Sequence, residues 1–109
     1  MNRNGSLFVP MKLDEAELAR RVDGIVDRMS PDVVRIRYTV TENWDGDPAV
    51  YFRVVLSDQA AAGAARREAI RSVRAAVRDE LNLAEWGYFP YFNFRGVTEQ
   101  SEVGDPAWE

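Results

Sequence analysis

The chain has 109 residues, a length that fits one domain with one hydrophobic core. Its composition, 46% apolar and 29% charged, is that of a soluble globular protein rather than a disordered one. The absence of cysteine and histidine excludes disulfides, thiolate nucleophiles, imidazole bases and the usual zinc ligands. The net charge of −4 weighs against non-specific binding to nucleic acid or to anionic membranes.

We expect a cytoplasmic bacterial protein from two features of the composition. No apolar run approaches the roughly 18 residues that a membrane span needs, and no signal peptide is visible. All basic residues except Lys12 are arginine and alanine is abundant, which indicates the coding bias of a high-GC bacterium.

The first helix is predicted from its cap and its periodicity. Before it, residues 1–12 form an expected loose arm whose apolar residues 7–9 can lie along a sheet edge. Asp14 can cap the first N–H groups of the helix, and Glu17 sits at its third position. Apolar residues then follow the 3.6-residue period and form one buried stripe: Leu18, Val22, Ile25, Val26 and Met29. Pro31 ends this helix.

Two alternating stretches, residues 33–41 and 49–57, predict strands that form an antiparallel hairpin. Between them, residues 42–48 carry the turn chemistry of Asn, Asp, Gly and Pro. The positions expected to face the core are Val34, Ile36, Tyr38, Val40, Val50, Phe52, Val54 and Leu56. The positions expected on the opposite, solvated face are Arg35, Arg37, Thr39, Thr41, Tyr51, Arg53 and Val55.

A second helix is predicted over about residues 60–81, a stretch rich in alanine, arginine and glutamate. Its expected buried stripe contains Ile70, Val73, Val77 and Leu81. A basic stripe lies about 100° round the helix and contains Arg67, Arg71, Arg74 and Arg78. Such a stripe is more often a solvated face than a phosphate-binding one.

Residues 86–96 contain six of the chain's twelve aromatic residues and predict the third strand. Alternation places Phe92 and Phe94 in the core. The opposite face then receives Tyr91, Asn93 and Arg95. Pro90 lacks an N–H and so belongs at the start of the strand or on a sheet edge.

Together these elements predict an α+β fold in which two helices cover one face of a three-stranded, mainly antiparallel sheet. The expected organisation is an arm at residues 1–12, one domain at residues 13–97, and an acidic tail at residues 98–109 without regular structure. The sequence Gly-Asp-Pro-Ala occurs at residues 46–49 and again at residues 104–107. This repeat indicates two similar turns and not a duplicated domain.

The open face of the sheet is the predicted binding surface. It gathers arginines and tyrosines without a carboxylate, which favours an anionic partner. The expected contacts on it are Arg35, Arg37, Tyr51, Arg53, Tyr91 and Arg95. Trp44 at the hairpin tip is a further candidate, because exposed tryptophans often anchor interfaces.

Two alternatives to a partner at this surface stay open. The arginines can pair with acidic residues of the tail, namely Glu99, Glu102 and Asp105. Trp44 can pack over the end of the first helix instead of facing a partner.

The order helix, strand, strand, helix, strand resembles half of a ferredoxin-like fold and the small dimerisation domains of cation-efflux transporters. Those domains bind metal largely through histidine, so none of their ligands carries over to this chain. Two strings, WDGDPAV at residues 44–50 and FPYFNFR at residues 89–95, resemble small uncharacterised bacterial proteins from toxin and antitoxin-like gene pairs. That resemblance implies a partner-binding protein and supplies no catalytic motif.

No constellation in the sequence indicates an enzyme, a cofactor or a metal site. Glu42, Asp45 and Asp47 can offer oxygens to Mg²⁺ or Ca²⁺, but the full calcium-loop spacing is absent and the turn already explains these residues. An exposed hairpin tip also gives a carboxylate no cleft in which its pKa would shift.

Two functions of different class remain as hypotheses. The first is a non-enzymatic protein-interaction module, either a homo-oligomer or an antitoxin-like accessory subunit, that binds through the arginine and tyrosine face or through a sheet edge. The second is binding of RNA or single-stranded DNA on the same face, with tyrosines stacking on bases and arginines pairing with phosphates.

Overall fold

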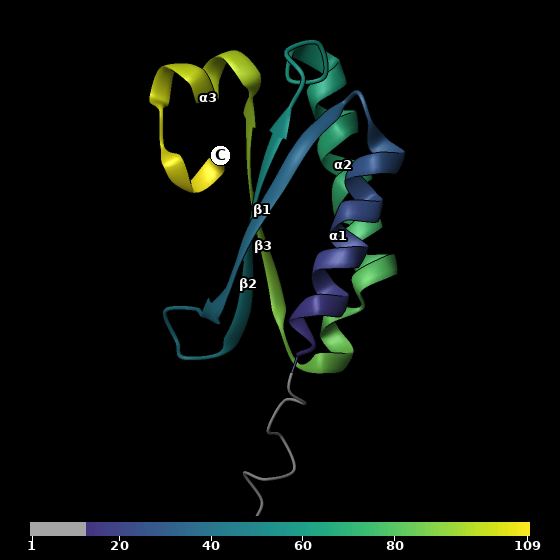
Figure 1. Ribbon diagram of the computed structural model, residues 1–109, viewed down its shortest axis with the longest axis vertical. Coiled ribbons are helices and arrows are strands. Elements are labelled where there is room, and N and C mark those ends of the chain that lie inside the picture. The colour runs from purple at the N-terminus through teal and green to yellow at the C-terminus, as the bar shows by residue number, and fades with distance from the viewer. Residues whose placement is uncertain (1–12) are drawn as a thin grey trace, which may run out of the picture.

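The computed structural model describes residues 13–109; the predicted arm at residues 1–12, with its edge-pairing residues 7–9, lies outside the described residues. The elements in chain order are α1 (Glu15–Met29), β1 (Val33–Glu42), β2 (Pro48–Leu56), α2 (Gly63–Leu81), the 3-10 helix η2 (Leu83–Trp86), β3 (Phe89–Gly96), α3 (Val97–Val103) and the 3-10 helix η3 (Pro106–Trp108). Figure 1 shows α1 and α2 on one side of the sheet and α3 on the other. Within the described residues, none of the helices combines the length and the apolar character needed to cross a lipid bilayer.

The predicted start of α1 is confirmed. The Oδ1 atom of Asp14 accepts a hydrogen bond from the backbone N–H of Glu17 at 3.1 Å, so the aspartate caps the helix. The buried residues of α1 are Leu18, Val22 and Ile25. One stripe of the helix therefore docks on the core, as its periodicity predicted.

The sheet has the order β1-β2-β3, with β2 in the centre. β1 and β2 form the predicted antiparallel hairpin, in which Arg37 lies opposite Arg53 and Thr39 lies opposite Tyr51. β2 and β3 run parallel, with Tyr51 beside Tyr91, because α2 carries the chain back to the other end of the sheet. The sheet is therefore mixed: one pair is antiparallel as expected and the other is parallel.

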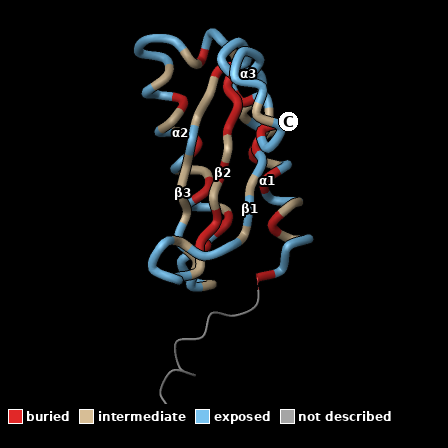
Figure 2. The backbone as a smooth tube through the Cα atoms, turned by 90° about the vertical axis from the view of Figure 1, so that its left-hand side faces the viewer, coloured by how far each residue is buried: buried red, intermediate tan, exposed pale blue. Residues whose placement is uncertain are grey.

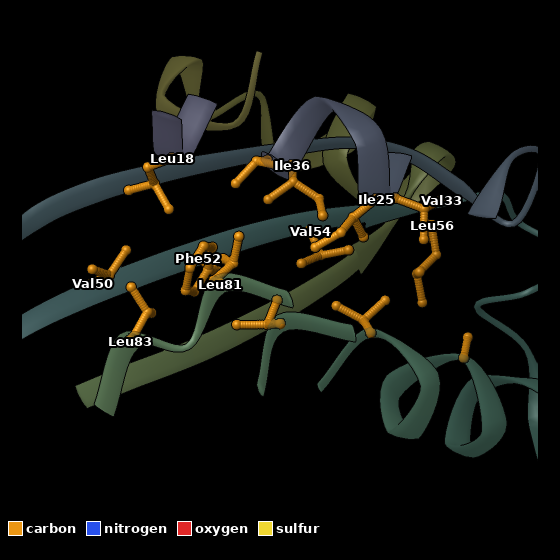
Figure 3. Close-up of a cluster of buried hydrophobic side chains, with 14 of the residues drawn as sticks. Leu18, Ile25, Val33, Ile36, Val50, Phe52, Val54, Leu56, Leu81 and Leu83 are labelled. Atoms are coloured by element: carbon orange, nitrogen blue, oxygen red, sulfur yellow. The ribbon is translucent and has the colours of Figure 1, made fainter. Parts of the chain in front are cut away.

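The core lies between the two long helices and the face of the sheet that they cover, here called the inner face (Figure 3). Phe52 of β2 is 1% exposed, and its ring stacks on that of Phe92 with 5.2 Å between the centroids. Phe92 and Phe94 pack against the core, yet both are only half-buried. The reason is that β3 forms the margin of the sheet, where one side of each ring has no neighbouring strand.

At the start of β1, the prediction of which side chains face the core is wrong. Val33 is buried and Val34 is 41% exposed, the reverse of the predicted alternation. The pairing with β2 shifts register between Val33 and Arg35, and a bulge of this kind moves the residues before it to the other face. From Arg35 onward the predicted alternation holds.

The prediction that residues 98–109 lack regular structure is also wrong. α3 and η3 form there, and Gly104 ends α3 with a φ of +71°, a left-handed conformation that glycine adopts without a steric cost. Residues 97–109, called the C-terminal segment below, lie on the outer face of the sheet, away from α1 and α2. They stand near the end of the sheet opposite the β1–β2 turn (Figure 1).

Candidate functional site

The outer face of the sheet has two parts, and Figure 2 shows this face toward the viewer with α3 above it. The C-terminal segment covers the part that carries the arginines. The part near the β1–β2 turn carries aromatic side chains and has no covering layer among the described residues. The residues predicted as partner contacts lie on these two parts or at the turn beside them: Arg35, Arg37, Trp44, Tyr51, Arg53, Tyr91 and Arg95.

Three of the predicted arginines bind the backbone of the C-terminal segment. The Nε atoms of Arg53, Arg35 and Arg37 donate, in that order, to the backbone oxygens of residues 107, 108 and 109, at 2.8, 2.7 and 2.8 Å. Arg35 also forms an ion pair with the side chain of Glu109, with 3.1 Å between Nη2 and Oε1. These acceptors offset the repulsion that like charges on neighbouring strands would otherwise cause.

Gln100 is the polar centre of this docked segment. It is 1% exposed, and its Oε1 accepts a hydrogen bond from Nη1 of Arg95 at 2.8 Å. Its Nε2 donates to the backbone oxygen of Asp105 at 2.7 Å and to Oε2 of Glu109 at 2.8 Å. Both ends of the buried amide are thus satisfied, as burial of a polar group requires.

Trp108 supplies the apolar part of the docking. Its ring is 4% exposed, and the guanidinium carbon of Arg95 lies 4.0 Å from the ring centre, a cation–π contact. Val55, predicted to face solvent, is fully buried although alternation places it on the outer face. The C-terminal segment explains that burial, because it covers this part of β2.

The start of α3 is fixed from the loop after β2. Asp58 accepts hydrogen bonds from the backbone N–H and the hydroxyl of Thr98, at 2.9 and 2.5 Å. The hydroxyl donor, followed by the backbone donor, holds the pKa of Asp58 below its ordinary value. Gly96 allows this approach, since a Cβ there would stand 2.9 Å from the Cβ of Ala61.

The acidic partners expected for the sheet arginines differ from those in the structure. Glu109 is the carboxylate that pairs with Arg35, whereas Glu99 lies 3.9 Å from Arg66 of α2. The remaining acidic candidates of the tail form no ion pair within residues 13–109. Sequence reasoning missed the backbone acceptors because every residue carries a carbonyl, which leaves no signal in a sequence.

The open part of the outer face carries an aromatic cluster, defined here as Trp44, Tyr51, Phe89 and Tyr91. Tyr91 is its centre: the centroid distances from Tyr91 are 4.9 Å to Tyr51, 5.6 Å to Trp44 and 5.1 Å to Phe89. Trp44 is 78% exposed and Phe89 is 60% exposed. The ring of Trp44 thus lies against Tyr91 and not over the end of α1. Phe89, which the sequence analysis left out of the candidate contacts, is the first residue of β3 and lies two residues before Tyr91, so it shares the outer face.

The hairpin turn holds Trp44 in place. Oδ1 of Asn43 accepts hydrogen bonds from the backbone N–H groups of Asp45 and Asp47, at 2.9 and 3.0 Å. Its Nδ2 donates to the hydroxyl of Tyr91 at 3.2 Å, which ties the turn to β3. The exposed tryptophan therefore stands on a turn with defined geometry.

The predicted arginine stripe of α2 is exposed to solvent. Arg71 pairs with Glu68 at 3.0 Å, and Arg78 pairs with Asp79 at 2.9 Å. Exposed pairs of this kind contribute little stability, typically about 0 to 1 kcal/mol. Much of the stripe is thus the solvated face that such patterns usually form.

Three further titratable groups of the described residues have shifted pKa values. In the part of the chain that the structure describes, no three carboxylates come close enough to hold a metal ion. The pKa of Glu17 is lowered mainly by a hydrogen bond from Arg21, and the pKa of Tyr38 is raised mainly by burial. The pKa of Arg78 is raised by its hydrogen bond to Asp79. Each of these shifts has a local cause.

A scan against family models, a search of curated proteins and a search of solved structures each found no match for this chain. The class of protein therefore has to be inferred from the geometry of the outer face.

Proposed function

We propose that this protein is a non-enzymatic interaction module that binds a protein partner through the aromatic cluster on the open part of its outer face. The observation that carries the proposal is the exposure of Trp44 and Phe89, 78% and 60%, in a cluster of fixed geometry. Large exposed apolar patches on monomeric domains mark interaction sites. Tryptophan and tyrosine are also the side chains most often found as binding hot spots.

The cluster suits binding because its side chains are already largely fixed before a partner binds. Tyr51 and Tyr91 already stack, and Asn43 already fixes the hydroxyl of Tyr91. Immobilising a flexible side chain at an interface costs about 0.5 to 1.5 kcal/mol, and rings that are already fixed avoid most of that cost. Burial of the exposed surface of Trp44 and Phe89 then contributes directly to affinity.

Nucleic-acid binding on the same face has weaker support. Bases stack on open ring faces, but Tyr51 and Tyr91 lie 16° from parallel and face each other. The arginines that would pair with phosphates donate to the C-terminal segment instead: Arg35, Arg37, Arg53 and Arg95. A partner that packs against ring edges, as a protein surface does, fits this arrangement better.

The partner can be a second copy of the chain or a distinct protein, as expected for an antitoxin-like or other accessory subunit. Both choices keep the partner on the same surface. The resemblance to ferredoxin-like dimerisation domains implies a module that works through contact.

The test compares three proteins by sedimentation and by affinity capture from a lysate of the source cells. Trp44→Ala combined with Phe89→Ala removes the exposed rings. Val103→Ser removes an apolar side chain that is 57% exposed on α3, near the end of the sheet opposite the β1–β2 turn. We expect one dominant complex with the wild type and with Val103→Ser, and at least about tenfold weaker association with the double variant. A wild-type monomer that captures nothing, or a complex that survives the double substitution, contradicts the proposal.

A further inference from the structure

The outer edge of β3 is an open strand edge beside the aromatic cluster. β2 occupies the centre of the sheet, so among residues 13–109 β3 pairs on one side only, and Figure 2 shows it at the margin of the sheet on the side of α2. A groove of ≈ 650 Å³ runs along this edge. Its walls are residues 89–93 of β3, Tyr51, and the side chains of Arg74 and Arg78 from α2.

The backbone of β3 presents free hydrogen-bonding groups to the groove. Nη2 of Arg66 donates to the carbonyl oxygen of Phe94 at 3.1 Å from outside the sheet, so Phe94 points its backbone groups outward. Backbone directions alternate along a strand, so Phe92 and Pro90 point outward as well. Among residues 13–109, no other hydrogen bond reaches this edge from a helix or a loop. The carbonyl of Pro90, both groups of Phe92 and the N–H of Phe94 are therefore available to an added strand.

The groove has a positive border in an acidic protein. The chain carries a net charge of −4, yet two arginines and no carboxylate line the groove. The guanidinium carbon of Arg74 lies 5.6 Å from the centre of the Phe92 ring, and no carboxylate of the described chain lies within 4.0 Å of it. Within the described residues, Arg78 pairs with Asp79 alone, an exposed pair that a ligand carboxylate can replace at small cost.

These charges select the occupant. Two copies joined edge to edge would bring the arginines of one copy toward those of the other, and like charges in that position destabilise pairing. An extended segment with carboxylates meets the same arginines favourably. Alternate side chains of such a segment would point to opposite faces of the sheet, one set toward Arg74 and Arg78 and the other toward Phe89 and Tyr91.

We infer that the outer edge of β3 binds an extended acidic peptide segment of the partner protein as a fourth strand. The carboxylates of that segment face Arg74 and Arg78, and its alternate apolar side chains cover Phe89 and Tyr91 on the outer face. This inference rests on the proposed function and specifies the chemistry of the partner. Pro90 offers no N–H, so pairing centres on Phe92 and Phe94.

The test uses a fluorescent synthetic peptide of alternating Glu and Val, with blocked ends, titrated with the full chain and followed by anisotropy. Its matched probes are an alternating Lys and Val peptide, a peptide with the same Glu and Val residues in two blocks, and oligothymidine. We expect binding of the alternating Glu and Val peptide only, with the amide protons of Phe92 and Phe94 slowed in hydrogen exchange. Arg74→Ala with Arg78→Ala is expected to weaken this binding at least about tenfold.

The control variant is Arg67→Ala with Arg71→Ala, which removes the same charge from the same helix outside the groove. It is expected to bind as the wild type does. The inference is overturned if the two double variants weaken binding equally. It is also overturned if the block peptide or the lysine peptide binds, if no peptide binds, or if oligothymidine alone binds. If the partner complex needs Trp44 and Phe89 but not Arg74 and Arg78, the proposed function stands and this inference fails; if the complex is independent of Trp44 and Phe89, the proposed function itself fails.

Discussion

The guanidinium group of Arg95 lies over the indole ring of Trp108, 4.0 Å from the ring centre, and joins β3 to η3. The same arginine donates to Gln100, whose amide reaches Asp105 and Glu109. This chain of contacts makes the C-terminal segment a third layer of the fold. It also separates the two parts of the outer face, because it covers the arginines and leaves Trp44 and Phe89 exposed among the described residues.

Trp108→Ala tests how much this layer contributes to stability. The substitution removes the buried ring and exposes Val55, so we expect the free energy of unfolding to fall by about 3 kcal/mol. Denaturant melts measure the loss, and hydrogen exchange shows where protection is lost. Glu102→Gln, an exposed change on α3, is the control. An unchanged melt for Trp108→Ala would mean that the segment adds nothing to the folded state.

Arg37→Glu together with Arg53→Glu tests the bonds to the backbone. Both side chains are partly or fully exposed, so we expect a loss of only about 1 to 2 kcal/mol. In a chain truncated before residue 97 the same double change should have little further effect, because its bonding partners are gone. Denaturant melts of the full chain and the truncated chain, each with and without the double change, complete this double-mutant cycle. A double change that is equally harmful with and without the segment would locate its effect elsewhere.

Asp58→Asn tests the hydrogen bonds that start α3 through pH dependence. The folded-state pKa of Asp58 lies below the ordinary value of 3.8 because Thr98 donates to the carboxylate. Such a group stabilises the fold above its unfolded pKa and loses that effect as pH falls through its folded pKa. The difference in melting temperature between wild type and variant should therefore be largest near neutral pH and should close in acid below 3.8. If the difference in melting temperature persists at low pH, the destabilisation by Asp58→Asn comes from a change in side-chain geometry and not from the loss of the charge.

Phe52→Ala and Phe92→Ala compare the centre of the core with its margin. Phe52 is 1% exposed, whereas Phe92 is half-buried and stacks on it. We expect losses of about 4 kcal/mol for Phe52→Ala and about 2 kcal/mol for Phe92→Ala. Equilibrium denaturation measures both. An equal or larger loss for Phe92→Ala would place that ring deeper in the core than the structure does.

The elements that the sequence predicted well depend on local signals. Asp14 caps α1, the apolar stripe of α1 faces the core, and the turn between β1 and β2 falls where Asn, Asp and Gly cluster. In the two Gly-Asp-Pro-Ala stretches, Gly46 and Gly104 both adopt positive φ, but the first stretch leads into β2 and the second into η3. Caps, periodicity and turn residues act within a few residues of one another, so a single sequence shows them.

The elements that the sequence could not predict depend on distant contacts. Val33 faces the core in place of Val34 because the pairing with β2 introduces a bulge. No residue near Val33 in the sequence indicates that bulge. Val55 is buried because residues 97–109 cover it from far along the chain. For the candidate site, alternation brought Tyr51 and Tyr91 to one face, but their stacking and the exposure of Phe89 needed the register of β2 and β3.

Arg35, Arg37 and Arg53 bind oxygens of the main chain, and this has an evolutionary consequence. A carbonyl is common to all amino acids, so a new side chain at the exposed position 107 leaves the bond from Arg53 intact. Selection then acts strongly on the arginines, on Trp108 and on Gln100, and weakly on such exposed positions. In proteins that descend from this chain, the backbone conformation of the C-terminal segment can therefore be retained while its exposed residues are substituted.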